Sequence, residues 1–218
     1  MYTFISYSSD IKKMAGKVKA YLDEYGFNCF LAHEDIPPQT VWPAEIVKAL
    51  EECNLFLPLL TTEFTTSFFC QQETGFAYCR KVEILPVMIS KAPMGMIADI
   101  QAVRFNEKEL EDSYWKIVDH VAKKTSLSGQ LLDALIKVFG ESESYDDAYE
   151  WAQYLLSGFT FTPRQVRAIK KHLENNSQIN ETKKARDVIF KFMKKHPTFF
   201  DDDLVDWYDK KSRTHMRY

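Results

Sequence analysis

Two apolar runs constrain the fold of this chain more than any other feature of its sequence. Residues 54–60 read NLFLPLL, and residues 82–89 read VEILPVMI. A strand with one face in water alternates polar and apolar residues, whereas a strand covered by helices on both faces is apolar almost throughout, as in the parallel sheets of α/β proteins. The two runs therefore predict central strands of a parallel sheet.

The segments around these runs alternate between strand-like and helix-like patterns. The expected strands are 2–6, 28–32, 54–60, 82–89 and 102–105. Helical patterns lie at 10–25, 43–52, 67–81 and 107–124, and the last two of these are the clearest. Five strands with five intervening or closing helical segments predict an α/β fold. The natural architecture is a flavodoxin-like doubly wound parallel sheet over residues 1–124.

The strand pattern ends after residues 125–129, which read TSLSG. Helices are expected at 130–139, 145–157, 163–175, 181–195 and 200–209. Thr162 and Pro163 supply an N-cap residue and a proline at the first helical position, which is a typical helix start. The sequence thus predicts a second, small all-α domain over residues 127–218.

Composition and charge exclude several classes of protein. The chain has 28 basic and 31 acidic residues and a formal charge of −3, which argues against a dedicated nucleic-acid partner. Residues 163–196 are rich in lysine and arginine, but aspartates follow at 201–209, so charged faces that meet each other or a neighbouring subunit are expected. No stretch approaches the roughly 20 apolar residues of a membrane span, and a cytoplasmic protein without membrane contact is expected.

The cysteines and histidines do not predict a metal site. Cys29, Cys53, Cys70 and Cys79 form no CxxC pair, and they are expected to be free thiols in a reducing compartment. His33 lies beside acidic residues in the sequence, but adjacent residues cannot easily converge on one ion. The chain also lacks the glycine-rich loops that cradle phosphates, GxGxxG and the Walker motif.

The strand ends are where a ligand is expected. In open α/β sheets ligands bind outside the carboxyl ends of the strands. Here those ends lead into residues 6–10, 32–42, 61–73 and 90–96, so hydroxyls, acids and aromatic rings converge on one edge. Within 65–73, TTSFFCQQE, a neutral aromatic stretch ends in the single acid Glu73. That acid is either a solvated helix residue or a carboxylate held there for chemistry.

Four segments together resemble a TIR (Toll/interleukin-1 receptor) domain. They are FISYSSD at 4–10, CFLAHEDIPPQTVWPAEIVKAL at 29–50, NLFLPLLTTEFTTSFFCQQETGFA at 54–77 and ILPVMI at 84–89, in the order that the family shows. The resemblance covers roughly the first 124 residues. It is greatest to bacterial stand-alone TIR proteins, which are often NAD-cleaving enzymes of anti-phage defence, and more distant to the scaffold TIR domains of animal receptors.

The resemblance implies roles for particular residues. Glu73 matches the catalytic glutamate of enzymatic TIR domains, in the pattern FCQQE at 69–73, with Phe69 where tryptophan is usual. The substrate-binding residues implied are Ser6, Tyr7, Ser8, Trp42, Phe69 and Cys70. Trp42 and Phe69 would flank the nicotinamide, and the residues after the first strand would face the ribose or phosphates. Cys70 is expected to be a packed thiol and not a nucleophile.

The loop after the second strand is where TIR domains contact one another. His33, Asp35, Pro38 and Gln39 are the assembly residues implied, and Gln39 stands where the family often has glycine. The implied partners are NAD as substrate, without a further cofactor, a second copy of the chain through the TIR and helical domains, and an effector protein.

The chemistry of NAD explains why one acid would be enough. Cleavage of the nicotinamide–ribose bond develops oxocarbenium character on the sugar, as in glycoside hydrolysis. Nicotinamide leaves a cationic pyridinium as a neutral molecule, so no general acid is required. A single carboxylate near the ribose would stabilise the developing charge.

Two other functions remain open at the level of sequence. A non-enzymatic TIR scaffold or adaptor would act by self-association, and Glu73 would then be incidental. A nucleotide-sensing TIR module would bind the same ligand without turnover. For an enzyme, the product is open too, because water and an adenine nitrogen compete for the sugar carbon to give linear, cyclic or conjugated ADP-ribose.

Overall fold

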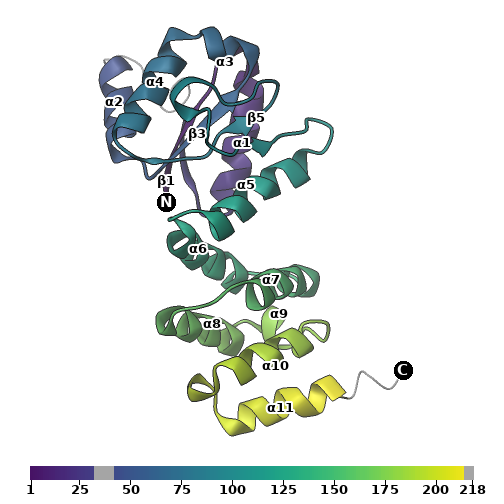
Figure 1. Cartoon of the computed structure of the whole chain (residues 1–218). Coiled ribbons are helices and arrows are strands. Elements are labelled where there is room, and N and C mark those ends of the chain that lie inside the picture. Colours follow the sequence, from purple (N-terminus) through teal and green to yellow (C-terminus); the bar gives the residue numbers. More distant parts are fainter. Residues whose placement is uncertain (32–41, 214–218) are drawn as a thin grey trace. The chain divides into compact units, whose positions relative to one another are not determined.

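The computed structural model describes residues 1–31 and 42–213 (Figure 1). The chain divides into two compact units, Met1–Leu132 and Asp133–Tyr218. The division falls inside one helix, α6 (Ser128–Gly140), so the first turn of that helix belongs to the first unit. None of the helices in the described ranges is long and apolar enough to cross a membrane.

The first unit contains the parallel sheet. Its strands are β1 (Tyr2–Ser6), β2 (Asn28–Leu31), β3 (Leu55–Leu60), β4 (Glu83–Ile84), β5 (Val87–Met88) and β6 (Val103–Arg104). Their order is β2-β1-β3-β5-β6, with β4 also paired to β3, and every pairing is parallel. This order confirms the predicted doubly wound α/β architecture.

The two apolar runs form the centre of the sheet, with one difference from the prediction. All six residues of β3 are buried, as expected for a strand covered on both faces. The expected strand at 82–89 is instead two short strands, interrupted at Leu85 and Pro86. Leu85 still donates its N–H to Phe56, but Pro86 has no N–H to continue the ladder with β3.

Helices cover both faces of the sheet. They are η1 (Ser9–Ile11), α1 (Lys12–Glu24), α2 (Trp42–Glu52), α3 (Thr62–Thr66), α4 (Phe68–Cys79), η2 (Gly95–Ile97) and α5 (Leu110–Lys124). Helices α1 and α5 pack on one side of the sheet, and α2 and α4 pack on the other (Figure 1). The fourth of the five expected helical segments is wrong as a full helix. Between β5 and β6 there is only the single turn η2, which begins at Gly95 with a φ of 61° that an α-helix excludes.

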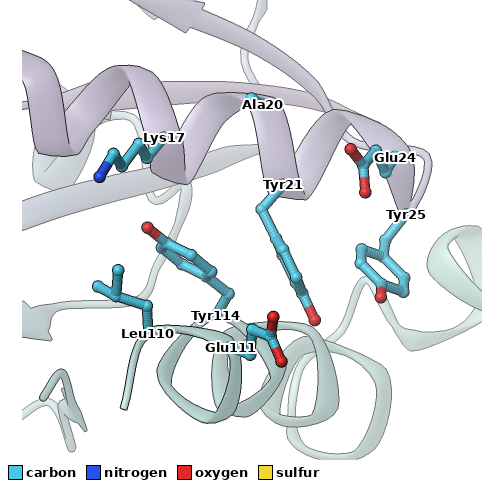
Figure 2. A pocket seen from close by; sticks show the side chains of 8 residues that line it. All are labelled: Lys17, Ala20, Tyr21, Glu24, Tyr25, Leu110, Glu111 and Tyr114. Carbon is cyan, nitrogen blue, oxygen red and sulfur yellow. The ribbon is translucent and has the colours of Figure 1, made fainter. Parts of the chain in front are cut away.

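Tyrosines join α1 to α5. Tyr21 packs against Tyr25 and Tyr114, with ring centroids 4.7 and 4.8 Å apart. Figure 2 shows these rings in a pocket of about 580 Å³ between the two helices. Burial raises the pKa of the Tyr21 hydroxyl, so this surface carries neutral phenols at physiological pH. The pocket lies on helices rather than at the carboxyl edge of the sheet.

The second unit is helical, as the sequence predicts. After α6 come α7 (Tyr145–Gly158), α8 (Pro163–Asn175), α9 (Ser177–Asn180), α10 (Arg186–Lys195), η3 (Pro197–Phe199) and α11 (Asp202–Arg213). The helix expected at 181–195 begins only at Arg186. Before it, Asn176 caps the separate short helix α9, and the buried Thr182 donates to the carbonyl of Tyr145 instead of continuing a helix.

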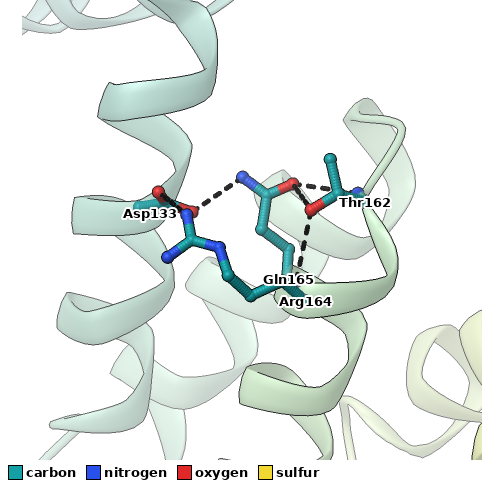
Figure 3. A network of polar contacts seen from close by, with 4 residues as sticks. All are labelled: Asp133, Thr162, Arg164 and Gln165. Carbon is teal, nitrogen blue, oxygen red and sulfur yellow. Dashed lines mark hydrogen bonds and ion pairs between the residues drawn. The ribbon is translucent and has the colours of Figure 1, made fainter.

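The predicted start of α8 is a complete capping box. Thr162 Oγ1 accepts the N–H of Gln165 at 3.3 Å, and Gln165 Oε1 accepts the N–H of Thr162 at 3.0 Å. Gln165 and Arg164 also donate to the carboxylate of Asp133 on α6 (Figure 3). The capping residues therefore start α8 and also connect it to α6 through hydrogen bonds.

The basic and acidic segments of this unit meet in one place. Lys170 Nζ on α8 lies 3.6 Å from Asp201 Oδ2, just before α11. This contact agrees with the expectation that the charged faces meet each other, although a surface ion pair of this kind contributes little to stability.

Candidate active site

The carboxyl edge of the sheet brings Glu73 against the first strand. Ser6 is the last residue of β1 and pairs with Pro58 of β3, so its side chain lies where β1 ends. Its Oγ donates a hydrogen bond of 2.5 Å to Glu73 Oε2 on α4. The two residues are 67 positions apart, so only the fold brings them together.

Glu73 lies on the buried face of helix α4. Ser67 caps the helix by accepting the N–H of Cys70, and the buried residues of α4 are Cys70, Glu73, Thr74 and Ala77. These positions follow the i, i+3, i+4, i+7 spacing of one helix face. An apolar residue at 73 would complete that stripe, yet the chain places a carboxyl group there.

Burial changes the acidity of this carboxyl group. Glu73 is 7% exposed. Loss of hydration raises its pKa from the ordinary 4.5 to about 7, although the hydrogen bond from Ser6 acts in the opposite direction. A buried carboxyl group with a pKa near neutrality, hydrogen-bonded at the carboxyl edge of the sheet, is typical of a reactive site rather than of a solvated helix face.

A second pair of hydroxyls lies at the same edge. Ser8 and Thr61 are both buried, and their side-chain oxygens are 2.9 Å apart. Thr61 directly follows β3 and also caps α3 by accepting the N–H of Phe64. Thr61 was not among the residues predicted for the site, although a threonine directly after a buried strand and three positions before an apolar residue is a recognisable cap signal.

Tyr7 and Cys70 are both buried at the predicted site. Tyr7 is 5% exposed and Cys70 is 2% exposed. Burial is the largest cause that raises the pKa of the Cys70 thiol, and Glu73 adds to it, so the thiol stays protonated. This supports the expectation that Cys70 packs rather than attacks.

The aromatic residues at the start of α4 lie at the surface. Phe68 is 86% exposed and Phe69 is 59% exposed. Phe69 is four residues before Glu73, which predicts a shared helix face, but the buried stripe begins at Cys70 and leaves the ring of Phe69 largely in solvent. The ring is thus available to a ligand or a partner and does not close over Glu73.

The remaining predicted residues are described only in part. Trp42 is the first residue of α2, and the structure describes its backbone. His33, Asp35, Pro38 and Gln39, the predicted assembly residues, lie outside the described residues. Within residues 1–31 and 42–213, no group of three His, Cys, Asp or Glu side chains is arranged to hold a metal ion.

Comparison with protein-family models identifies the first unit. The family model described as TIR domain matches residues 3–118. Among solved structures, the chain is similar to the TIR domain of the Toll-related receptor TRR-2 from Hydra magnipapillata, with 14% sequence identity and a TM-score of 0.47 over 54% of this chain and 94% of that one. No curated protein matches the chain.

The family match spans more than half of the chain, from β1 into α5. It contains the parallel sheet except for Tyr2, the first residue of β1, and every described residue of the candidate site. The chain therefore belongs to the TIR domain family.

Proposed function

We propose that this chain cleaves the nicotinamide–ribose bond of NAD, with Glu73 as the catalytic carboxylate. The observation that carries the proposal is the buried Ser6–Glu73 pair at the carboxyl edge of the parallel sheet. A structural role alone does not explain an acid on the buried face of α4. Burial of a carboxyl group costs free energy that an alanine or leucine at that position would not.

The chemistry uses the position and environment of that carboxylate. In the ground state the nicotinamide ring of NAD is cationic, and as the bond breaks positive charge moves to the ribose. A carboxylate fixed by Ser6 in a water-poor site stabilises this charge more strongly than it would in water, because the local dielectric is low. No general acid is needed, because nicotinamide leaves as a neutral molecule.

The raised pKa fits the same cycle. Because burial raises the pKa of Glu73 to about 7, a protonated and an ionised form of the free enzyme coexist near neutral pH. A bound cationic ring beside the carboxylate favours the ionised form, so substrate itself generates the active state. The attraction between the bound cationic ring and the carboxylate thereby offsets the free energy that burial of the charge costs.

The other predicted residues have supporting roles in this proposal. Phe69 presents a largely exposed ring one turn before Glu73, where it is able to stack on nicotinamide together with Trp42. Ser8 and Tyr7 face the ribose and phosphate side. The biological role is bacterial anti-phage defence, either through a linear, cyclic or conjugated ADP-ribose signal or through loss of NAD, and it involves self-association of the chain.

A scaffold function is the second candidate, and one observation favours it. Phe68, next to Phe69 at the start of α4, is 86% exposed. Neighbouring exposed aromatic rings are characteristic of contact surfaces between proteins. On this account the chain acts by docking to itself or to an effector, and Glu73 performs no chemistry.

Proton NMR of NAD incubated with the purified chain at high concentration separates these functions. Release of nicotinamide establishes the enzyme, and the accompanying sugar signals identify the product. If no nicotinamide appears, even with crowding agents or phage-infected lysate, catalysis is rejected and the scaffold function is adopted.

A further inference from the structure

A second candidate site lies in the helical unit and shares no residue with the candidate active site. A pocket of about 550 Å³ opens there, within the size range of small-molecule sites. It is lined by Tyr145, Asp146, Glu181, Thr182, Lys183, Lys184, Arg186 and Trp207. The lining comes from the start of α7, the segment between α9 and α10, the first residue of α10, and α11. We call it the Arg186 pocket.

Arg186 is the feature that needs an explanation. The residue is 9% exposed, and its Nε is buried without a hydrogen-bond partner. No carboxylate in the part of the chain that the structure describes forms an ion pair with its guanidinium group. Its guanidinium group lies over the ring of Trp207, with Cζ 5.8 Å from the ring centroid. A buried N–H of a guanidinium group without an acceptor is costly, and an anionic ligand in the pocket would remove that cost.

The two acids of the pocket have partners among its own lining residues. Asp146 pairs with Lys184 at 2.7 Å, and Glu181 accepts the hydroxyl of Tyr145 at 3.3 Å. Lys183 is exposed at the pocket and forms no ion pair with the described residues. Three basic residues (Lys183, Lys184 and Arg186) line the pocket against the two acids, so its lining carries a net positive charge.

The start of α10 adds to this positive character. Arg186 is the first residue of the helix, and the N-cap residue Ala185 has no side-chain oxygen to accept the terminal N–H groups. Uncapped N–H groups and the helix dipole favour an anion, and phosphate groups commonly occupy such ends. By itself a helix end is weak evidence, but here it coincides with the buried arginine.

Two aromatic rings complete the pocket. Trp207 is 40% exposed and Tyr145 is 48% exposed, and both line the same cavity. Exposed aromatic faces beside a cationic group are the arrangement with which proteins stack flat bases and neutralise phosphates. We propose that the Arg186 pocket binds a nucleotide, with its phosphate against Arg186 and Lys183 and its base against Trp207.

This site is independent of the proposed NAD cleavage. It lies in the unit that begins at Asp133, whereas Glu73 and Ser6 lie in the first unit. A chain that both binds a nucleotide here and cleaves NAD would be able to couple its activity to nucleotide levels. Nucleotide binding at the Arg186 pocket would equally occur in a scaffold without activity.

Isothermal titration calorimetry tests the proposal by measuring how the full chain binds AMP and, separately, inorganic phosphate. Arg186→Gln and Trp207→Leu remove the two principal contacts, and Lys183→Gln changes an exposed residue without risk to the fold. Lys191→Gln is the matched control, because Lys191 is an exposed lysine of the same helix that pairs with Asp187 outside the pocket. Circular dichroism establishes that each variant is folded.

The expected result is saturable AMP binding that weakens at least about 10-fold in Arg186→Gln and in Trp207→Leu, less in Lys183→Gln, and not in Lys191→Gln. Phosphate alone is expected to bind at least about 10-fold more weakly than AMP. The proposal is overturned if AMP does not bind at millimolar concentration, or if its binding is unchanged in Arg186→Gln. It is overturned as well if Trp207→Leu has no effect or phosphate binds as tightly as AMP, because the pocket would then be a simple anion site.

Discussion

Ser6 Oγ donates a 2.5 Å hydrogen bond to Glu73 Oε2, and this contact joins the end of the first strand to the middle of α4. Glu73 is 7% exposed and has a pKa of about 7, so the pair is a hydroxyl beside a carboxyl group that changes charge near neutrality. Substitutions of Ser6 and Glu73 therefore test the proposed chemistry of the site.

Removal of the hydroxyl is expected to impair NAD cleavage and to shift its pH dependence. In Ser6→Ala the carboxylate loses a hydrogen bond that favours its charged form, so the pKa of Glu73 rises further. We expect kcat/KM at pH 7 to fall by about 10-fold or more, because hydrogen bonds to charged groups contribute ~1.5–3 kcal/mol. The acid limb of the pH–kcat/KM profile should move to higher pH.

Ser9→Ala is the control for that variant, because Ser9 follows the same strand but is exposed. An unchanged pH profile in Ser6→Ala would show that Ser6 does not set the acidity of the catalytic group.

Glu73 also makes the stability of the fold depend on pH. Its pKa is about 7 in the folded chain and 4.5 ordinarily, so between these values the folded state holds a proton that the unfolded state releases. The free energy of unfolding therefore falls as pH rises through this window, by about 3 kcal/mol in total. The side chain in Glu73→Gln is uncharged at every pH, so it does not lower the free energy of unfolding as pH rises.

Chemical denaturation of both proteins from pH 4.5 to 8 measures the effect. The stability of Glu73→Gln relative to the parent chain should increase with pH and level off above 7. A constant difference across this range would mean that Glu73 is not protonated on folding.

Close packing in the helical unit predicts one sensitive glycine. A Cβ atom at Gly140 on α6 would lie 2.1 Å from Nδ1 of His172 on α8, too close without movement of that ring. Gly140→Ala is expected to lower the free energy of unfolding by about 1–3 kcal/mol, the usual cost of overpacking.

Gly158→Ala is the matched comparison, because nothing lies within 4 Å of a Cβ atom at that helical position. It should be neutral or slightly stabilising. Equal stability of the two variants in denaturant titrations would contradict the close approach of α6 and α8.

The capping box of α8 predicts a smaller effect. Thr162→Ala removes the acceptor for the N–H of Gln165 and should cost ~1 kcal/mol of unfolding free energy. Amide hydrogen exchange in the first turn of α8 should accelerate, whereas Thr160→Ala, at an exposed position before the helix, should leave it unchanged. Unaltered exchange in Thr162→Ala would show that the contact with Asp133, rather than the cap, holds this end.

The sequence predicts where helices and strands lie better than it predicts where they break or shorten. Apolar runs mark β3 because burial on both faces requires them, and Thr162 marks the start of α8 because capping is local. The break at Pro86 and the single turn at Gly95 were not expected, although both residues have recognisable backbone limits. Hydrophobic pattern alone does not show which neighbour a strand residue pairs with.

In the candidate site, too, the sequence indicates individual residues but not their tertiary contacts. The resemblance to TIR domains indicated Glu73, and the structure adds Ser6 as its hydrogen-bond donor and Thr61 as the partner of Ser8. Arg186 could not be recognised among the many basic residues of 163–196, because its burial depends on how α10 packs against α11. Tertiary contacts decide which member of a charged segment is withdrawn from water.

The rate of nicotinamide release by Glu73→Gln tests the central claim most directly. The substitution keeps the shape of the side chain and an oxygen for Ser6 but removes the charge. Glu63→Gln, an exposed acid on the preceding helix α3, serves as the control. We predict release by the parent chain and by Glu63→Gln, and a loss of at least about 100-fold in Glu73→Gln at pH 8. Equal rates in all three proteins would contradict the assignment of Glu73 as the catalytic carboxylate.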